Sequence, residues 1–345
     1  MTPKVVLVTG VARHLGAQVA ARLAADRRVE RVVGIDAARP SGEVARLVEG
    51  VECRQLDLRS PEIARLLADA EVQAVAHLAI VTAVDHQSGG RAAMKEHNVI
   101  GTMQLLAACQ QAPALRKLVV RSSTAAYGAS FRDPAVFTED TEPRAVPRGG
   151  YGRDVLDVEG YVRGFRRRRP SVVATVLRFA PFVGPRADTR LTRYFALPVV
   201  PTVLGRDPRL QFVHVDDALE ILVRSVTEDH PGTFNVAGPG VLTLNQAIRR
   251  AGRVAAPVVE PGLSGMAGFA KRFGFVDFSL DQLDLFVHGR VVDVSALVEE
   301  FGFEPRPTAV AFDEFVKGQG FGPLGPDRVR AAEQAILERI RQVRS

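Results

Sequence analysis

The chain of 345 residues contains no tryptophan and only two cysteines, Cys53 and Cys109. These two follow no paired spacing, which argues against a disulfide framework and predicts no metal site. No apolar run approaches the roughly 18 residues that a membrane span requires. A strand-like run, "PKVVLVTG", begins at the third residue and leaves no room for a signal peptide. We therefore expect a cytoplasmic protein without a membrane span.

Lysine is scarce as well, because only five of the 45 basic residues are lysines and none lies between Lys117 and Lys271. Arginine thus carries most of the positive charge, at a formal net charge of +6. Arginine suits phosphate recognition, but a GC-rich genome produces the same bias, and the arginines are spread along the chain. The densest run, Arg166–Arg169, is interpreted as a solvated helix end. Since no aromatic platform accompanies it, we predict no nucleic-acid partner.

Apolar sequence is abundant, at 46% of the residues with a mean hydropathy of +0.04. Strand-like apolar runs alternate with helix-period segments up to residue 180. The runs are continuous, which indicates strands that are buried on both faces. The pattern predicts an α/β fold with a doubly wound parallel sheet of the Rossmann type. The predicted strands are Val5–Thr9, Arg31–Asp36, Val51–Gln55, Ala74–Ala79, Lys117–Ser122 and Val172–Phe179.

Helical patterns fill the gaps between these strands. They cover residues 16–25, 60–70 and 94–112. In the second of them, Ser60 is a suitable N-cap and Pro61 suits the first helical position.

Beyond residue 180 the pattern breaks into short segments punctuated by proline and glycine, and helical patterns return at 214–226 and 243–254. We predict a Rossmann domain over residues 1–180, to which sheet elements return at about 210–240, and a smaller substrate lobe over 181–325. The apolar, glycine-rich segment 261–275 is predicted to be a lid or a lobe helix. Residues 326–345 are predicted to form an amphipathic helix that packs on its own domain or, alternatively, on a second subunit.

A candidate dinucleotide site lies in "VVLVTGVARHLGAQVAARL", where a strand turns into a helix. Gly10 can make the turn, Gly16 lets the helix pack close to the sheet, and the helix N-terminus offers N–H groups to a pyrophosphate. Asp36 ends the second strand about twenty residues further on. A carboxylate there accepts hydrogen bonds from a ribose diol and repels a 2′-phosphate, so NAD is favoured over NADP. Arg39 is close enough in sequence to weaken that preference.

Further motifs follow in order along the chain. They are "CRQLDLRS", "HLA", "NVIGT", "RSSTAAYG", "LRFAPFVGP", "FVHVDDAL" and "GTFNVAGPG". With the glycine turn and Tyr151, this order resembles the extended short-chain dehydrogenase/reductase family, the NAD-dependent epimerases and dehydratases of nucleotide sugars. The resemblance runs from Lys4 to about Phe315. It implies an NAD-dependent oxidoreductase that acts on a nucleotide sugar or a related polar metabolite, with a homodimer as the expected assembly.

The resemblance also assigns roles to single residues. Ser123 orients the substrate hydroxyl and Tyr151 transfers its proton, while the nicotinamide carries the hydride. The cofactor-binding residues so implied are Gly10, Arg13, His14, Leu15, Gly16, Asp36, Asp57, Leu58, Ala79, Asn98, Ser122 and Tyr151. The candidates for binding the substrate are Ser123 and Thr124, with Arg186, Arg193 and Arg290 as candidate ligands of a diphosphate.

Four positions depart from the family's pattern. Arg13 replaces the central glycine of the first motif, where its side chain must swing aside, clamp the phosphates or crowd the cofactor. Val155 replaces the lysine that follows the tyrosine by four residues, on the same helix face as Tyr151. Pro181 replaces a substrate-loop asparagine, and Leu210 replaces an arginine.

The missing lysine leaves the function open, because a free tyrosine has a pKa of about 10, too high for an efficient base near neutrality. The leading prediction is an epimerase- or dehydratase-like enzyme with an altered catalytic pair. The alternative is a dinucleotide-binding sensor or assembly protein without turnover. A third reading is a reductase whose substrate supplies the missing acid or base.

Overall fold

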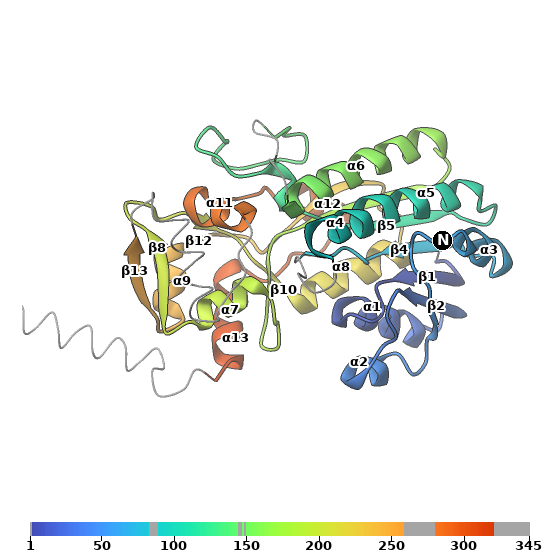
Figure 1. Ribbon diagram of the computed structural model, residues 1–345, viewed down its shortest axis with the longest axis horizontal. Coiled ribbons are helices and arrows are strands. Elements are labelled where there is room, and N and C mark those ends of the chain that lie inside the picture. The colour runs from blue at the N-terminus through green and yellow to red at the C-terminus, as the bar shows by residue number, and fades with distance from the viewer. Residues whose placement is uncertain (1, 83–88, 144–146, 148–149, 259–279, 321–345) are drawn as a thin grey trace, which may run out of the picture.

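A computed structural model describes residues 2–82, 89–143, 147, 150–258 and 280–320. Its centre is a parallel sheet of seven strands in the order β11-β6-β5-β4-β1-β2-β3 (Figure 1). The strand order reverses beside β1, which confirms the predicted doubly wound Rossmann sheet. The strands are β1 Val5–Thr9, β2 Arg31–Asp36, β3 Glu52–Gln55, β4 Ala74–His77, β5 Lys117–Ser123, β6 Val173–Phe179 and β11 Gly232–Val236.

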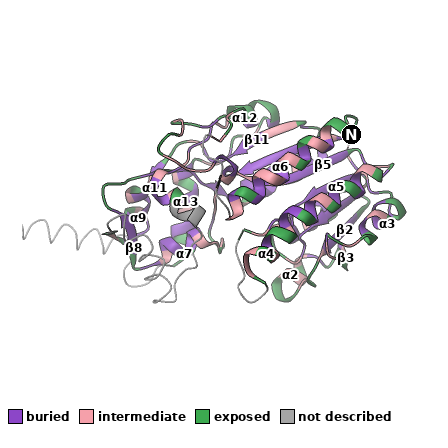
Figure 2. Cartoon of the chain, turned by 45° about the horizontal axis from the view of Figure 1, so that its top comes forward, coloured by how far each residue is buried: buried purple, intermediate pink, exposed green. Residues whose placement is uncertain are grey.

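Helices cover both faces of this sheet. One face carries α1 (His14–Ala25), α2 (Gly42–Leu47), α8 (Val215–Thr227) and α12 (Ser295–Phe301). The other carries α3 (Glu62–Asp69), α5 (Gly101–Gln111) and α6 (Gly150–Arg168). Most of the strands are buried between the two helix layers, whose outer faces are exposed (Figure 2), whereas the edge strand β3 is largely exposed.

The alternation of side chains along the central strand explains why both layers are needed. In β1, Val6 and Val8 pack towards α1 and α8, whereas Leu7 between them packs towards α3 and α5. All three side chains are fully buried. Each such side chain stabilises the fold by about 1.5–3 kcal/mol relative to exposure, so a continuous apolar strand favours a sheet covered on both faces.

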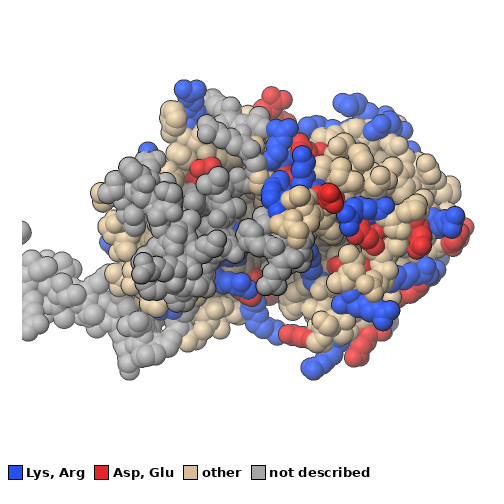
Figure 3. Space-filling model, viewed as in Figure 1, with Lys and Arg blue, Asp and Glu red and all other residues tan. Residues whose placement is uncertain are grey.

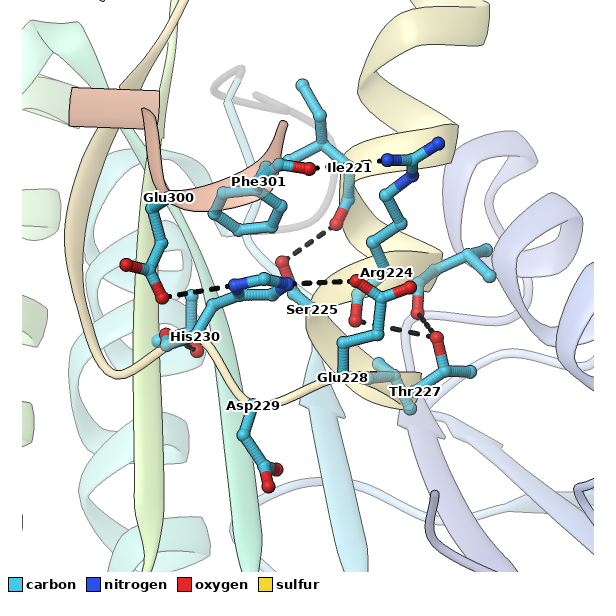
Figure 4. A network of polar contacts seen from close by, with 12 residues as sticks. Ile221, Arg224, Ser225, Thr227, Glu228, Asp229, His230, Glu300 and Phe301 are labelled. Carbon is cyan, nitrogen blue, oxygen red and sulfur yellow. Dashed lines mark hydrogen bonds and ion pairs between the residues drawn. The ribbon is translucent and has the colours of Figure 1, made fainter. Parts of the chain in front are cut away.

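Helix α12 is fastened to the sheet domain through His230, in the loop between α8 and β11. Its Nδ1 lies 3.2 Å from a Glu300 carboxylate oxygen and its Nε2 lies 3.1 Å from one of Glu228 (Figure 4). The imidazole also stacks on the Phe301 ring at 3.9 Å between centroids. The Glu300 contact and the Phe301 ring thus hold α12 against this loop, while Glu228, at the end of α8, contacts the other nitrogen of the imidazole.

A smaller lobe with its own core lies beside the sheet (Figure 1). Its centre is aromatic: Phe195 meets Phe312 edge-on at 5.0 Å, and Phe212 stacks on Phe312 at 5.3 Å. The elements of the lobe and its junction are β7 Phe182–Val183, α7 Arg190–Ala196, β8 Val199–Val203, β9 Arg209–Leu210, β10 Val213–His214, β12 Leu242–Thr243, α9 Leu244–Arg250, β13 Val254–Val258, α11 Leu280–His288 and α13 Thr308–Gly318.

Three local predictions need correction. Helix α3 begins at Glu62 with Pro61 as its N-cap, although the Ser60 hydroxyl still accepts the Glu62 N–H at 3.3 Å. The continuous helix predicted over 94–112 is divided by a π-helical turn, η1 (Glu96–Ile100), which separates α4 (Gly90–Lys95) from α5. The predicted segments 261–275 and 326–345 lie outside the described residues.

The arginine run is the third correction, because two of its members are not solvated. Arg166 donates to the Ala174 carbonyl at 2.7 Å, and Arg169 donates to the Gln110 carbonyl. Elsewhere many arginines pair with carboxylates, as Arg31 does with Glu52 at 2.6 Å. On the part of the surface in Figure 3 that is not grey, basic and acidic side chains are interspersed.

Candidate active site

The turn between β1 and α1 depends on two glycines. Gly10 has a φ of +85°, and a Cβ there would lie 3.0 Å from the Ala79 backbone. A Cβ on Gly16 would lie only 2.2 Å from the Gly10 carbonyl oxygen. The turn is closed by the Arg13 N–H, which donates to the Gly10 carbonyl at 3.1 Å. The chain therefore makes a tight turn that leads straight into the N-terminus of α1.

Asp36 is fixed at the mouth of this turn. One carboxylate oxygen accepts the Ala12 N–H at 3.1 Å and the other accepts the Ala38 N–H at 3.2 Å. Each oxygen keeps a further lone pair for a ligand hydroxyl. Arg39 does not pair with this carboxylate among the described contacts; its Nε donates to the Gln55 side chain at 3.1 Å.

The N-terminus of α1 carries no side-chain cap at Arg13. Arg13 and His14 are both exposed, and His14 contacts Gln18 one turn along the helix. Leu15, half-buried, packs against the core beneath the turn. The charge of Arg13 helps to lower the pKa of His97, after burial of that imidazole. The positive charge of Arg13 therefore acts on His97 near the carboxyl edge of the sheet, while its side chain is exposed to solvent.

The loop after β4 is held by η1. The Asn98 side chain accepts the Val81 N–H at 2.8 Å and donates to the Val81 carbonyl at 2.9 Å. His97 contacts the Ala79 carbonyl at 2.9 Å. The side chain of Asn98, predicted to bind cofactor, is thus engaged by protein groups and braces the strand end.

Two of the predicted cofactor-binding residues, Asp57 and Leu58, follow β3. The Asp57 carboxylate pairs with Arg59 at 2.8 Å, and this contact lowers the pKa of Asp57 to about 2. Leu58 is buried, and a Cβ on Gly101 would lie 3.1 Å from its Cβ. Leu58 therefore contributes a buried apolar side chain beside Gly101, whereas the Asp57 carboxylate is paired with Arg59.

The predicted catalytic pair meets at the carboxyl end of β5. The Ser123 hydroxyl accepts the Ala125 N–H at 3.1 Å and so caps the 3-10 turn η2 (Thr124–Tyr127). It donates in turn to the Phe179 carbonyl at 3.4 Å. Tyr151 enters from the first turn of α6 and lies close enough for Ser123 to act on its pKa. Burial is the largest influence and raises the pKa of Tyr151 above its usual value, although the charge of Arg121 and the nearby Ser123 hydroxyl act to lower it.

Val155 occupies the helix position where the resemblance expects a lysine, and its side chain is only 1% exposed. The preceding Asp154 is equally buried, and its carboxylate accepts two hydrogen bonds from Arg91, at 2.6 and 2.5 Å. Asn98 donates to the same carboxylate at 3.2 Å. This part of α6 therefore holds a neutralised ion pair and an apolar side chain beside Tyr151.

Ser122 and Thr124 point away from the catalytic pair or into the protein. The Ser122 hydroxyl donates to Glu159 of α6 at 2.5 Å, and Thr124 is buried. Glu159 in turn pairs with Arg178 at 2.7 Å. Both hydroxyls are thus enclosed by the protein, and the cofactor and substrate roles assigned to these two residues stay predictions.

The three predicted substrate arginines lie in different settings. Arg290 donates to the Gly128 carbonyl at 2.8 Å, just beyond η2, and so lies near the end of β5. Arg193 is exposed and pairs with Asp188 at 2.5 Å. Arg186 is exposed in the loop after β7. The structure brings Arg290 towards Ser123 and leaves the other two on the lobe.

Sequence reasoning missed Arg121, Arg91 and Asp154. Arg121 precedes Ser123 by two residues in a strand, so the two-residue period of β-structure places both on one face. That spacing was a usable signal. The Arg91–Asp154 pair joins residues 63 positions apart and carried no local signal.

Two surveys of the described residues complete the description of the site. No group of three or more histidine, cysteine or acidic side chains in these residues is placed to hold a metal ion. None of the described helices has the length and apolar content needed to cross a membrane.

Comparisons with known proteins agree with this geometry. The model of the NAD dependent epimerase/dehydratase family matches residues 6–237. An uncharacterised protein of Mycobacterium tuberculosis is 44% identical over 333 residues, which cover 96% of this chain and 88% of that protein.

Solved structures share the fold at low sequence identity. The UDP-glucose 4-epimerase of Thermotoga maritima with UDP-glucose has a TM-score of 0.69 at 20% identity, covering 91% of this chain and 98% of that one. The UDP-glucuronic acid 4-epimerase of Bacillus cereus in complex with NAD has a TM-score of 0.67 at 18% identity, covering 94% and 96%.

Proposed function

The chain belongs to the NAD dependent epimerase/dehydratase family, and on that premise we propose that it is an NAD-dependent oxidoreductase acting on a nucleotide sugar or a related polar metabolite. The observation that carries the proposal is the placement of Ser123, at the carboxyl end of β5, close to Tyr151 in the first turn of α6. Ligands of doubly wound sheets bind at this edge, beside the point where the strand order reverses.

The residues around the β1–α1 turn fit a dinucleotide. The close contacts at Gly10 and Gly16 leave backbone, rather than side chains, facing a pyrophosphate, and the N-terminus of α1 has no competing side-chain cap. Asp36 holds its carboxylate ready for the adenosine ribose hydroxyls and disfavours the 2′-phosphate of NADP. Arg13 is exposed and can reach over a bound phosphate as a charged clamp. NAD⁺, when bound there, supplies the hydride acceptor.

The protein's own part in the reaction is positioning and proton transfer. Ser123 holds the reacting hydroxyl of the substrate, and Tyr151 accepts the hydroxyl proton. General-base help of this kind typically contributes about 10²–10⁴ in rate. Arg290, anchored beside Gly128, is the arginine best placed to meet a diphosphate of the substrate.

The test is a direct assay of the purified protein. Binding of NAD⁺ and NADP⁺ is measured by calorimetry, and a panel of UDP- and dTDP-sugars is followed both by NADH absorbance and by chromatography of the sugar. We expect NAD⁺ to bind, at least one sugar nucleotide to be converted, and Tyr151→Phe to lose at least about 10²-fold in turnover.

The matched control is Tyr161→Phe. Tyr161 lies on the same helix with 37% of its surface exposed, so its loss should leave turnover unchanged. Conversion of a sugar that survives in Tyr151→Phe would reject the proton-transfer role of Tyr151.

A second candidate function is a dinucleotide-binding protein without turnover. The burial of Val155 in place of a lysine favours it, because the helix face then supplies no ammonium to Tyr151. This candidate predicts tight NAD⁺ binding with no conversion of any sugar. The homodimer implied by family resemblance stays a prediction, to be measured by sedimentation equilibrium.

A further inference from the structure

Arg121 is an unexpected residue at the carboxyl end of β5. Successive side chains of a strand point to opposite faces. Ser122 points to α6, where it donates to Glu159 at 2.5 Å. Arg121 and Ser123 therefore share the other face, one pleat apart, and the guanidinium belongs to the same corner of the sheet as the catalytic pair.

The guanidinium of Arg121 is held without an anionic partner. One terminal nitrogen donates to the Ile80 carbonyl at 3.3 Å, and the group lies over the Phe182 ring at 5.4 Å from its centroid. Its Nε is buried and has no hydrogen-bond partner, and Arg121 forms no ion pair within the described residues. Arg121 is half-buried, and a cation that is partly removed from water is costly unless an anion compensates for it, so this position is suited to a group that becomes negative.

Tyr151 is the neighbouring group that can become negative. It lies close to Ser123 at the end of the strand. Burial raises the pKa of Tyr151 overall and lowers that of Arg121, but the charge of each group acts against this shift in the other. Asp154 opposes this by raising the pKa of Tyr151, but its carboxylate is already paired with Arg91. The charge of Arg91 is thus largely committed to that pair.

We propose that Arg121 takes over the electrostatic role of the lysine that Val155 replaces, so that its guanidinium, placed beside Ser123 on β5, stabilises the phenolate of Tyr151. Arg121 is then a positioning residue that acts through Tyr151. The chemical use of the phenolate rests on the proposed function. There the Tyr151 oxygen would accept the proton of the substrate alcohol, and NAD⁺, when bound, would supply the acceptor for the hydride that the alcohol carbon loses as it becomes a carbonyl group.

The test measures the acidity at position 151 directly and needs no substrate. Tyr151 is replaced site-specifically by 3,5-difluorotyrosine, a stronger acid than tyrosine that titrates within the stable pH range, and its ionisation is followed by ¹⁹F NMR. In Arg121→Gln we expect the titration midpoint to move to higher pH by about one unit or more, because an opposite charge close by favours the ionised form. Arg121→Lys keeps a cation and should stay near the parent midpoint.

The matched control is Arg153→Gln. Arg153 lies two residues from Tyr151 on α6, is half exposed and pairs with Asp157 at 3.2 Å. Its loss should leave the midpoint unchanged. An unchanged midpoint in folded Arg121→Gln, or an equal shift in Arg153→Gln, rejects the proposal.

Two further outcomes are informative. If Arg121→Gln does not fold, Arg121→Met takes its place, because it also removes the charge while keeping an unbranched side chain, and a midpoint that fails to rise contradicts the proposal. If Arg121→Gln weakens NAD⁺ binding but leaves the midpoint in place, Arg121 serves the cofactor phosphates instead. Because the titration uses no sugar, a failure to find turnover rejects the proposed function without touching this result.

Discussion

At the scale of single residues, the proposed role of Arg121 replaces a lysine on a helix by an arginine on a strand. Burial lowers the pKa of the Arg121 guanidinium, but arginine starts from so high a value that it stays charged at neutral pH. A lysine in equal surroundings loses its proton more readily, since burial lowers its pKa from a smaller starting value. An arginine at this half-buried position therefore keeps its positive charge near Tyr151. Val155 can then be an apolar residue of the core.

Asp57 gives a pH dependence at the same scale. Its pKa in the folded protein is lowered to about 2 by Arg59, below the unfolded value of about 3.9. The carboxylate therefore stabilises the fold above about pH 4, and this contribution is lost as the pH falls towards 2. Because the pair is partly exposed, we expect about 1 kcal/mol or less.

Urea unfolding at pH 6 and pH 3 measures this contribution. Asp57→Asn should lose less stability between the two pH values than the parent protein does. Asp140→Asn is the control, since Asp140 is exposed and forms no ion pair in the described part of the chain. Equal pH dependence in Asp57→Asn and the parent would disprove the linkage.

At the scale of elements, strands were easier to predict than helix continuity. Strands β1 and β2 agree with the prediction to the residue, because their apolar runs are bounded by Gly10 and by Asp36. The π-helical turn at Glu96–Ile100 was not predicted, because its residues make contacts with a segment that is distant in the sequence. Asn98 forms a hydrogen bond with Val81, and His97 contacts the Ala79 carbonyl. The periodicity of apolar side chains within one helix cannot predict contacts of this kind.

The start of α1 yields a prediction about packing. Gly16→Ala places a Cβ 2.2 Å from the Gly10 carbonyl oxygen, so the helix must move away from the turn. We expect the free energy of unfolding to fall by about 1–3 kcal/mol and NAD⁺ affinity to fall with it. Both are measured by chemical denaturation and calorimetry.

Gly160→Ala is the matched control on α6. Its added Cβ has no neighbour closer than the end of the Arg163 side chain, at 3.7 Å. There alanine should raise the unfolding free energy by about 0.5–1 kcal/mol, because it restricts the unfolded chain and suits a helix better. If both variants behave alike, close packing at Gly16 is not what requires glycine.

At the scale of the whole molecule, the site joins segments that only the topology brings together. The positions of Gly10 and Asp36 at the ends of β1 and β2 could be predicted from the sequence, because they belong to a recognisable strand–turn–helix pattern. Arg121, Arg91 and Tyr151 come from β5, α4 and α6, and their meeting depends on strand order and on which face each side chain takes. Charge compensation of this kind becomes visible only when the partners' positions are known.

Ligand binding should stabilise the whole chain by mass action. At a free NAD⁺ concentration of 100 times its Kd, the unfolding free energy should rise by about 2.7 kcal/mol, seen as a higher Tm. NADP⁺ at the same concentration should stabilise less, because Asp36 repels its 2′-phosphate. Asp36→Asn removes that repulsion and should bring the two Tm shifts together, whereas Arg39→Gln, whose parent side chain is bonded to Gln55, should keep them apart. If Arg39→Gln rather than Asp36→Asn changes the preference, the dinucleotide does not bind with its ribose at the end of β2.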